Sequence, residues 1–433
     1  MKIGKYFTTN HIIEGLIIAL SLSAFIYIEY FKLLNGYILI TVNSILALFG
    51  LYRLLKADTP TWFFSGFLIG TLWLWWMSIS FIHYKLPYLV PVSLLLIAFT
   101  MGLIFLFLAY IASYISRKIE NKFPLIEQEK TIYFLRSLVL IALIFIEPFG
   151  FNWLKLLLIF TDSAFGLHIW QFALILFALS LYLTFKKWYL LLLILFAIDL
   201  RNPKIIKANT LRDIELTSTN IRVENKWLPK NQAIYTKLAL KKIDKAIAKN
   251  KKLIILPESL LPYFLNLEQS YLEEFLERSK KITIVIGSLY FISQNNYKNS
   301  AYIIDKGSFK IANKVILVPF GETNPLPKWM GSIVNKIFFD GAVDYGADKN
   351  YTYINALGKR YKIAICYEGT KDKTYEDYPK YLILISNNGW FIPSIEPTLQ
   401  QILLKYYAKI YKTTIYHSVN GSKSYVVVPH PDI

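Results

Sequence analysis

The stretch Tyr361-Lys-Ile-Ala-Ile-Cys366-Tyr-Glu-Gly369 decides how the second half of this chain is interpreted. An apolar, β-branched run ends abruptly in a thiol, and polar residues and a glycine follow. This pattern is typical of a strand that ends at a nucleophile. Cys366 is the only cysteine among 433 residues, so the sequence predicts no internal disulfide. The usual alternative for a lone cysteine is a buried structural residue.

Two other apolar runs end in charged residues. One is Leu253-Ile-Ile-Leu-Pro-Glu258-Ser259, and the other is Asn313-Lys314-Val-Ile-Leu-Val-Pro-Phe-Gly-Glu322. A carboxylate, an ammonium and a thiol, each at the edge of a buried-strand pattern, are the minimum set of groups for acyl transfer through a thioester. The sequence therefore places its candidate chemistry at three strand ends.

Apolar stretches dominate the first 200 positions of the chain. Crossing a bilayer requires about 20 such residues. The stretches of that length run over 11–30, 35–55, 61–82, 87–115, 131–149 and 167–185, and the shorter stretch 188–200 is a seventh candidate. The sequence therefore predicts a membrane domain of about seven helices over 1–200, followed by a globular domain over 201–433.

The lysines and arginines predict the orientation in the membrane, because cytoplasmic loops are enriched in them. With seven spans, the N-terminus and the loops after spans two, four and six carry eleven of these residues, against three on the other side. We therefore expect a cytoplasmic N-terminus and an external globular domain, an orientation that depends on the short seventh stretch. No small-x-small cleavage site follows the first stretch, so we expect an uncleaved anchor.

The formal charge of the chain is +19, and the part after position 200 holds 34 basic and 20 acidic residues. Attachment to a membrane makes anionic lipid headgroups a better partner for this surface than nucleic acid. The five histidines and the cysteine show no metal-ligand spacing, and the sequence contains no glycine-rich phosphate loop. We therefore expect no metal, no cofactor and no nucleic-acid partner.

Beyond Arg201, short apolar runs alternate with stretches of helical periodicity, which favours a layered α/β fold. The continuous apolar character of 253–256 and 382–385 indicates strands buried on both faces. The predicted helices are 231–249, 268–280 and 396–411. The predicted strands are 212–219, 252–257, 282–291, 300–305, 314–318, 351–356, 361–366, 381–386, 413–418 and 424–428.

Three further apolar segments are interpreted from their position. Leu260–Leu267 follows Glu258 and is predicted to be an apolar loop beside the site. Residues 329–338 have helical apolar spacing, which fits either a helix packed on the core or a mobile arm that dips into the membrane interface. The segment 149–165 lies between two predicted spans and is interpreted as re-entrant or interfacial.

These motifs resemble those of a known superfamily. Glu258 in Leu-Pro-Glu-Ser, Lys314 before Val-Ile-Leu-Val-Pro-Phe-Gly-Glu, and Cys366 in Ile-Cys-Tyr-Glu resemble the Glu-Lys-Cys triad of the nitrilase, or carbon–nitrogen hydrolase, superfamily. The membrane half narrows the resemblance to the apolipoprotein N-acyltransferases, the bacterial enzymes that complete lipoprotein maturation. Further matching residues are Asn220, Trp227, the stretch Ser386-Asn-Asn-Gly-Trp390-Phe, and Asn420-Gly421.

The resemblance implies a multi-span α-helical membrane domain joined to a nitrilase-like αββα sandwich, on the periplasmic side of the bacterial inner membrane. It implies that Cys366 takes an acyl chain from a phospholipid and donates it to the N-terminal amine of a diacylglyceryl-cysteine apolipoprotein. Glu258 would act as the base, and Lys314 would bind the oxyanion with the backbone N–H of Tyr367. Members of that family commonly carry a final span after the domain, and this sequence departs from that pattern by stopping at Ile433.

Neighbouring residues are candidates for supporting roles. Glu322 and Glu368 are expected to orient Lys314 and the nucleophile loop, and the alternative for both is a carboxylate satisfied within a turn. An acyl or headgroup pocket requires apolar and aromatic walls, although aromatic residues beside a core also serve as plain packing. The candidates for this pocket are Trp227, Tyr367, Asn387 and Trp390.

Other functions stay open at this point. A membrane-tethered amidase or nitrilase would use the same triad on small amides, and apolar segments beside the site favour acyl transfer over it. A transporter or receptor with a binding-only outer domain predicts that Cys366→Ala leaves function intact. A Cys-His hydrolase would require His417 or His430, and neither residue has a flanking signature.

Overall fold

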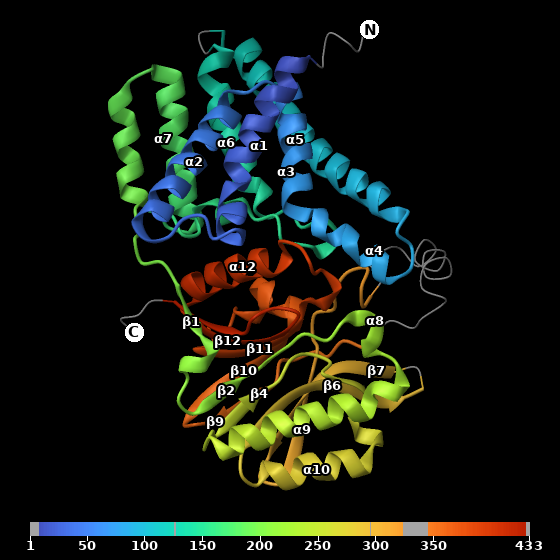
Figure 1. Cartoon of the computed structure of the whole chain (residues 1–433). Helices are drawn as coiled ribbons and strands as arrows, with labels where there is room; N and C mark the ends of the chain where they lie inside the picture. Colours follow the sequence, from blue (N-terminus) through green and yellow to red (C-terminus); the bar gives the residue numbers. More distant parts are fainter. Residues whose placement is uncertain (1–7, 125–126, 295, 324–344, 430–433) are drawn as a thin grey trace. The chain divides into compact units, whose positions relative to one another are not determined.

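The computed structural model describes residues 8–124, 127–294, 296–323 and 345–429, and its contacts divide the chain into two compact units. The helical unit comprises Met1–Ile146, Trp153–Asn202 and Pro393–Tyr406. The sandwich unit comprises Glu147–Asn152, Pro203–Ile392 and Tyr407–Ile433. Each unit therefore combines segments that lie far apart in the sequence, and Figure 1 shows the elements of both.

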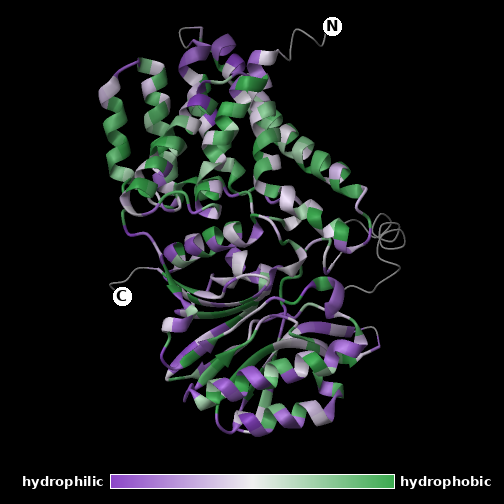
Figure 2. Ribbon diagram, in the orientation of Figure 1, coloured by the Kyte–Doolittle hydropathy of each residue, from purple (hydrophilic) through white to green (hydrophobic). Residues whose placement is uncertain are grey.

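The helical unit consists of long apolar helices, and Figure 2 shows hydrophobic residues dominating them. Within the described residues, four helical stretches are long and apolar enough to cross a membrane, which confirms a multi-span membrane domain. They are α1 (Thr9–Tyr30), α2 (Gly36–Lys56), the run Thr59–His83 made of α3 (Thr59–Leu74), η2 (Trp75–Ile79) and α4 (Ser80–His83), and α5 (Leu89–Lys122). The shorter helices are α6 (Gln128–Leu143), α7 (Ile169–Phe185) and the ten-residue 3₁₀ helix η5 (Trp188–Ala197), which lies within the expected seventh stretch 188–200.

Two sheets form the sandwich unit (Figure 1). The strand order of the first is β1-β13-β12-β11-β10-β9, with β3 beside β12, and that of the second is β2-β4-β6-β7-β8, with β5 beside β6. The first sheet contains β1 (Lys204–Lys207), β3 (Ser218–Thr219), β9 (Tyr353–Ala356), β10 (Lys359–Ile365), β11 (Tyr381–Asn387), β12 (Thr414–Asn420) and β13 (Tyr425–Val428). The second contains β2 (Ile214–Leu216), β4 (Leu253–Ile255), β5 (Leu261–Phe264), β6 (Thr283–Ser293), β7 (Asn296–Asp305) and β8 (Ser308–Asn313).

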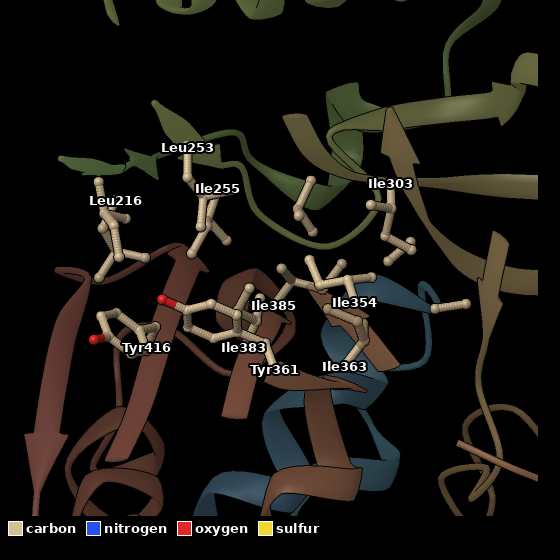
Figure 3. Packing of buried hydrophobic residues seen from close by; sticks show 14 of the residues in the cluster. Leu216, Leu253, Ile255, Ile303, Ile354, Tyr361, Ile363, Ile383, Ile385 and Tyr416 are labelled. Carbon is tan, nitrogen blue, oxygen red and sulfur yellow. The ribbon is translucent and has the colours of Figure 1, made fainter. Parts of the chain in front are cut away.

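Side chains from the two sheets meet in one apolar core, which Figure 3 shows. Ile363 and Ile383 from the first sheet pack with Leu253 and Ile255 from the second. The other face of the second sheet packs against the apolar stripes of α9 (Gln232–Ala248) and α10 (Gln269–Ser279). Helix α12 (Glu396–Tyr411) connects the parallel neighbours β11 and β12. The predicted layered α/β domain, with two sheets packed face to face, is confirmed.

Two local predictions are wrong. Residues 314–318 do not form a strand, because the Glu368 carboxylate takes the backbone N–H groups of Val315 and Ile316 that a neighbouring strand would otherwise bind. The segment Leu260–Leu267 is not a loop throughout: it contains the edge strand β5, and Leu261 is buried in the core under α9 and α10. The predicted amphipathic stretch 329–338 lies outside the described residues.

Candidate active site

The three predicted reactive residues follow the ends of three strands. Glu258 lies just beyond β4, Lys314 directly after β8, and Cys366 directly after β10. The Lys314 Nζ atom is 3.6 Å from Glu258 Oε1, and both charges act on the Cys366 sulfur. The fold therefore brings together a carboxyl group, an ammonium and a thiol that the sequence spreads over 108 positions, from Glu258 to Cys366.

Cys366 begins a 3₁₀ turn, Cys366–Thr370, and its φ of 55° lies in the left-handed region. A non-glycine residue in this conformation is uncommon and is typical of a sharp turn that presents a functional side chain. Burial raises the pKa of the thiol well above its ordinary value, and the carboxylates of Glu258 and Glu322 add to the shift. The Lys314 ammonium and a hydrogen bond from the Asn387 backbone oppose it. The resting group is therefore a thiol, which needs a base before it attacks.

Lys314 is fully buried and lies between two carboxylates. Its Nζ atom is 2.8 Å from Glu322 Oε2 and 3.6 Å from Glu258 Oε1. Burial alone would lower the pKa of Lys314, but its interactions with Glu322, Glu258 and Cys366, including the hydrogen bond to Glu322, outweigh burial and raise the pKa. Lys314 is therefore a permanent positive charge in a site of low dielectric, where its effect on a nearby anion is large.

A further residue, Asn299 on β7, joins this network and was not predicted. Its Nδ2 atom donates to Glu258 Oε1 at 2.8 Å and to Glu322 Oε1 at 2.9 Å. Its backbone carbonyl accepts from the Lys314 N–H at 2.9 Å. The only sequence signal was a polar side chain immediately before the predicted strand 300–305.

The loop that carries Glu258 fits tightly against β6. Glu258 is 5% exposed, and Ser259 after it has a φ of 47°. A Cβ atom at Gly287 would lie 2.6 Å from Glu258 Cα, a distance that forces the backbone to shift. A glycine at position 287 is therefore required for Glu258 to approach the sheet at this point.

Glu368 connects the turn after β8 with the nucleophile turn. Its Oε1 atom accepts from the N–H of Val315 at 2.6 Å and of Ile316 at 3.0 Å, and its Oε2 atom accepts from Ile365 N–H at 2.7 Å. Burial raises its pKa to about 7, against the opposing effects of Lys314 and of these three N–H groups. Glu368 thus fixes the backbone just after Lys314 and just before Cys366.

Residues 150–152, part of the segment 149–165 interpreted as re-entrant or interfacial, contact the nucleophile turn. Gly150 accepts a hydrogen bond from the Tyr367 hydroxyl at 2.7 Å, and the Phe151 ring stacks on the Tyr367 ring at 5.9 Å between centroids. Asn152 Nδ2 donates to the Thr370 carbonyl at 2.8 Å. All these residues belong to the sandwich unit, although the segment precedes the turn by more than 200 positions.

The predicted pocket residues and the two histidines are described by their own contacts and burial. Asn387 Oδ1 accepts from Asn420 Nδ2 at 2.7 Å and from Gly389 N–H at 3.3 Å, so its side chain stabilises a turn. Trp390 is half-buried in that turn, and Trp227 is 39% exposed. His417 is buried against Ser386, and burial lowers its pKa to about 3, so it remains neutral. His430 lies outside the described residues.

Relatives of the whole chain identify its family. Residues 9–201 match the family model described as the apolipoprotein N-acyltransferase integral membrane domain. The apolipoprotein N-acyltransferase of Wolinella succinogenes is 35% identical over 95% of this chain and 94% of its own length. The corresponding protein of Helicobacter pylori is 36% identical over 93% of this chain and 91% of its own length. The chain belongs to the apolipoprotein N-acyltransferase family.

Solved structures also show a limited similarity to part of this family member. An amidase from Nesterenkonia sp. AN1 covers 50% of the chain and 84% of its own length, with 12% identity and a TM-score of 0.37. A CN-hydrolase superfamily protein from Xanthomonas campestris covers 53% of the chain and 86% of its own length, with 13% identity and a TM-score of 0.37.

Within the described residues, no group of three His, Cys, Asp or Glu side chains is arranged to hold a metal ion.

Proposed function

We propose that this chain transfers a fatty acyl chain from a phospholipid to the N-terminal amine of a diacylglyceryl-cysteine apolipoprotein, through a thioester on Cys366. The observation that carries the proposal is the cluster of buried Glu258, buried Lys314 and half-buried Cys366 at three strand ends, in a member of the apolipoprotein N-acyltransferase family. A protonated thiol beside a carboxyl group and a fixed ammonium supplies a nucleophile, a base and an oxyanion partner.

In the first step the Cys366 sulfur attacks the ester carbonyl of the phospholipid, and Glu258 takes the thiol proton. The negative charge that develops on the carbonyl oxygen is stabilised by Lys314 and the backbone N–H of Tyr367. The C–O bond then breaks, and the proton on Glu258 passes to the leaving lysophospholipid oxygen. The products of this step are a lysophospholipid and an acyl-enzyme.

In the second step the neutral amine of the acceptor attacks the thioester carbonyl. An amide bond forms, the C–S bond breaks, and one amine proton returns through Glu258 to the sulfur. Glu322 and Asn299 hold Lys314 and Glu258 in place during both steps, because each forms a hydrogen bond of 2.9 Å or less with one of them. Water must be excluded while the thioester waits for the amine.

We place the membrane domain over 1–200 in the bacterial inner membrane and the catalytic domain over 201–433 on the periplasmic side. The eleven lysines and arginines on one set of loops, against three on the other, support this orientation. The phospholipid donor would then come from the same bilayer, and the lipoprotein acceptor would approach along it.

A product assay tests the function. The purified chain is incubated in nanodiscs with phospholipid and a synthetic peptide that carries an N-terminal diacylglyceryl-cysteine. We expect the peptide to gain the mass of one fatty acyl chain, and Cys366→Ala to abolish this gain. Release of ammonia from simple amides without any acylated peptide would instead identify a membrane-tethered amidase.

A further inference from the structure

A second lysine, Lys226, is buried beside the proposed base. The short helix α8 (Val223–Lys226) directs Val223 and Lys226 inward, because residues three apart lie on the same face, whereas Glu224 and Asn225 are exposed. Lys226 has no exposed surface, and its Nζ atom donates to the Glu258 backbone carbonyl at 3.3 Å. The ammonium therefore lies next to the residue that accepts the thiol proton.

A lysine is a costly choice for this position. Taking an ammonium out of water costs several kcal/mol, and a neutral carbonyl returns only part of that. Burial lowers the pKa of Lys226 to about 8, and the charges of Glu258 and Cys366 limit the fall. An apolar residue of similar volume would avoid the cost, so packing alone does not explain the lysine.

The neighbouring charged groups explain why a lysine occupies position 226. Among the described residues, the carboxyl groups of Glu258 and Glu322 both form ion pairs with one ammonium, that of Lys314. Lys226 places a second ammonium beside Glu258. Because the interaction between two charges is mutual, a thiolate that stabilises the Lys226 ammonium is itself stabilised by it to the same extent.

We propose that Lys226 is a positioning residue of the active site, which holds the Glu258 loop by its carbonyl and supplies the second positive charge that favours ionisation of Cys366. The proposal deepens the acyl-transfer function stated above and rests on it. When Cys366 gives its proton to Glu258, negative charge moves from the carboxylate to the sulfur. The Lys226 ammonium donates to the Glu258 carbonyl and interacts electrostatically with both Glu258 and Cys366, so it stabilises the charge before and after this transfer.

Alkylation of Cys366 tests this role without requiring acyl transfer. Iodoacetamide reacts with thiolates, and because Cys366 is the only cysteine, the mass of the intact protein reports on it alone. Rates are measured between pH 6 and pH 10 for the full chain in detergent. The variants are K226Q, which keeps a donor for the Glu258 carbonyl but removes the charge, and K226R, which keeps both.

The matched control is K362M. Lys362 is also buried, and its pKa is also lowered to about 8 by burial, but its Nζ atom binds Asp377 and the Thr374 carbonyl. We expect K226Q to be alkylated roughly tenfold more slowly than wild type at pH 7, the effect of one unit in the thiol pKa. The difference should shrink above pH 8, where wild-type Lys226 loses its own proton. K226R and K362M should stay within a factor of two to three of wild type.

Two results would overturn the proposal. One is a K226Q rate that equals wild type, or differs by the same factor at every pH, while thermal unfolding shows an intact fold. The other is an equal loss in K362M, which would indicate general loosening of the sandwich unit. If K226Q does not fold, the wild-type profile decides: its slope against pH must decrease near pH 8, and a constant slope rejects the role. Failure of the peptide-acylation assay with an intact alkylation effect would reject acyl transfer only.

Discussion

The Asn299 amide donates a hydrogen bond to Glu258 Oε1 over 2.8 Å. The same nitrogen also donates to Glu322 Oε1, and Glu322 binds Lys314, so one amide bridges the two carboxyl groups of the site. Glu258 thus has one oxygen fixed by Asn299, which leaves its other oxygen for the thiol proton. Asn299 and Lys314 together orient the proposed base.

Removing that amide tests its importance. We expect Asn299→Ala to lower the rate of acyl transfer about 10- to 100-fold, because an unanchored Glu258 is less well placed and two carboxylates repel each other. The control is Asn266→Ala, which removes an amide hydrogen bond to the Phe291 carbonyl in the same unit. Initial rates of peptide acylation are compared for the two variants. Equal rates would show that Asn299 serves packing rather than the base.

Glu368 predicts a pH dependence of stability. Its pKa is raised from 4.5 to about 7 in the folded protein, so folding favours the protonated form. The contribution of this group is therefore complete below pH 4.5 and is lost as the pH rises through about 7. We expect Glu368→Gln to remove this part of the decrease, which is measured by thermal unfolding at pH 5, 6, 7 and 8. Parallel curves for variant and wild type would contradict the shift.

The contact between β6 and the Glu258 loop is sensitive to one methyl group. Gly287→Ala places a Cβ atom 2.6 Å from Glu258 Cα, so the loop must move. We expect a loss of stability of about 1–3 kcal/mol and a loss of most activity. Ser293→Ala, at the exposed end of the same strand, is the control and should behave as wild type. Thermal unfolding and peptide acylation are measured together, and full activity in Gly287→Ala would contradict the tight fit.

Two substitutions at Tyr367 test whether its contacts with Gly150 and Phe151 hold the nucleophile turn in place. Tyr367→Phe removes the hydrogen bond to Gly150 but keeps the ring stacked on Phe151. We expect a loss of about 1 kcal/mol in stability and activity within about threefold of wild type. Tyr367→Leu, which also removes the stack, should lower the unfolding temperature further and reduce activity more strongly. An active and fully stable Tyr367→Leu would show that the segment 147–152 does not hold the nucleophile turn.

The sequence alone predicted the parts of the site that end apolar runs. Glu258 and Cys366 each follow a continuous β-branched stretch and precede polar or small residues, so local pattern places them at strand ends. The helices α9 and α10 followed from periodicity in the same way. These features depend on neighbours a few positions away, and such information is present in any single sequence.

Features that depend on distant partners were missed. The predicted strand 314–318 fails because a carboxylate more than 50 positions later captures its N–H groups. Strand β5 was hidden by Pro262, which is tolerated because β5 pairs only with β6 at an edge. Asn299 and Lys226 carry no local signature, since their roles come from charges that only the folded chain brings together.

Trapping the acyl-enzyme tests the central claim most directly. The purified chain is incubated with phospholipid in the absence of any acceptor and is then analysed by intact mass spectrometry. We expect a mass increase of one fatty acyl chain on Cys366, its loss on addition of the diacylglyceryl peptide, and no increase in Cys366→Ala or Glu258→Gln. A wild-type protein that acylates the peptide without ever carrying this adduct, or an adduct that survives in Cys366→Ala, would contradict it.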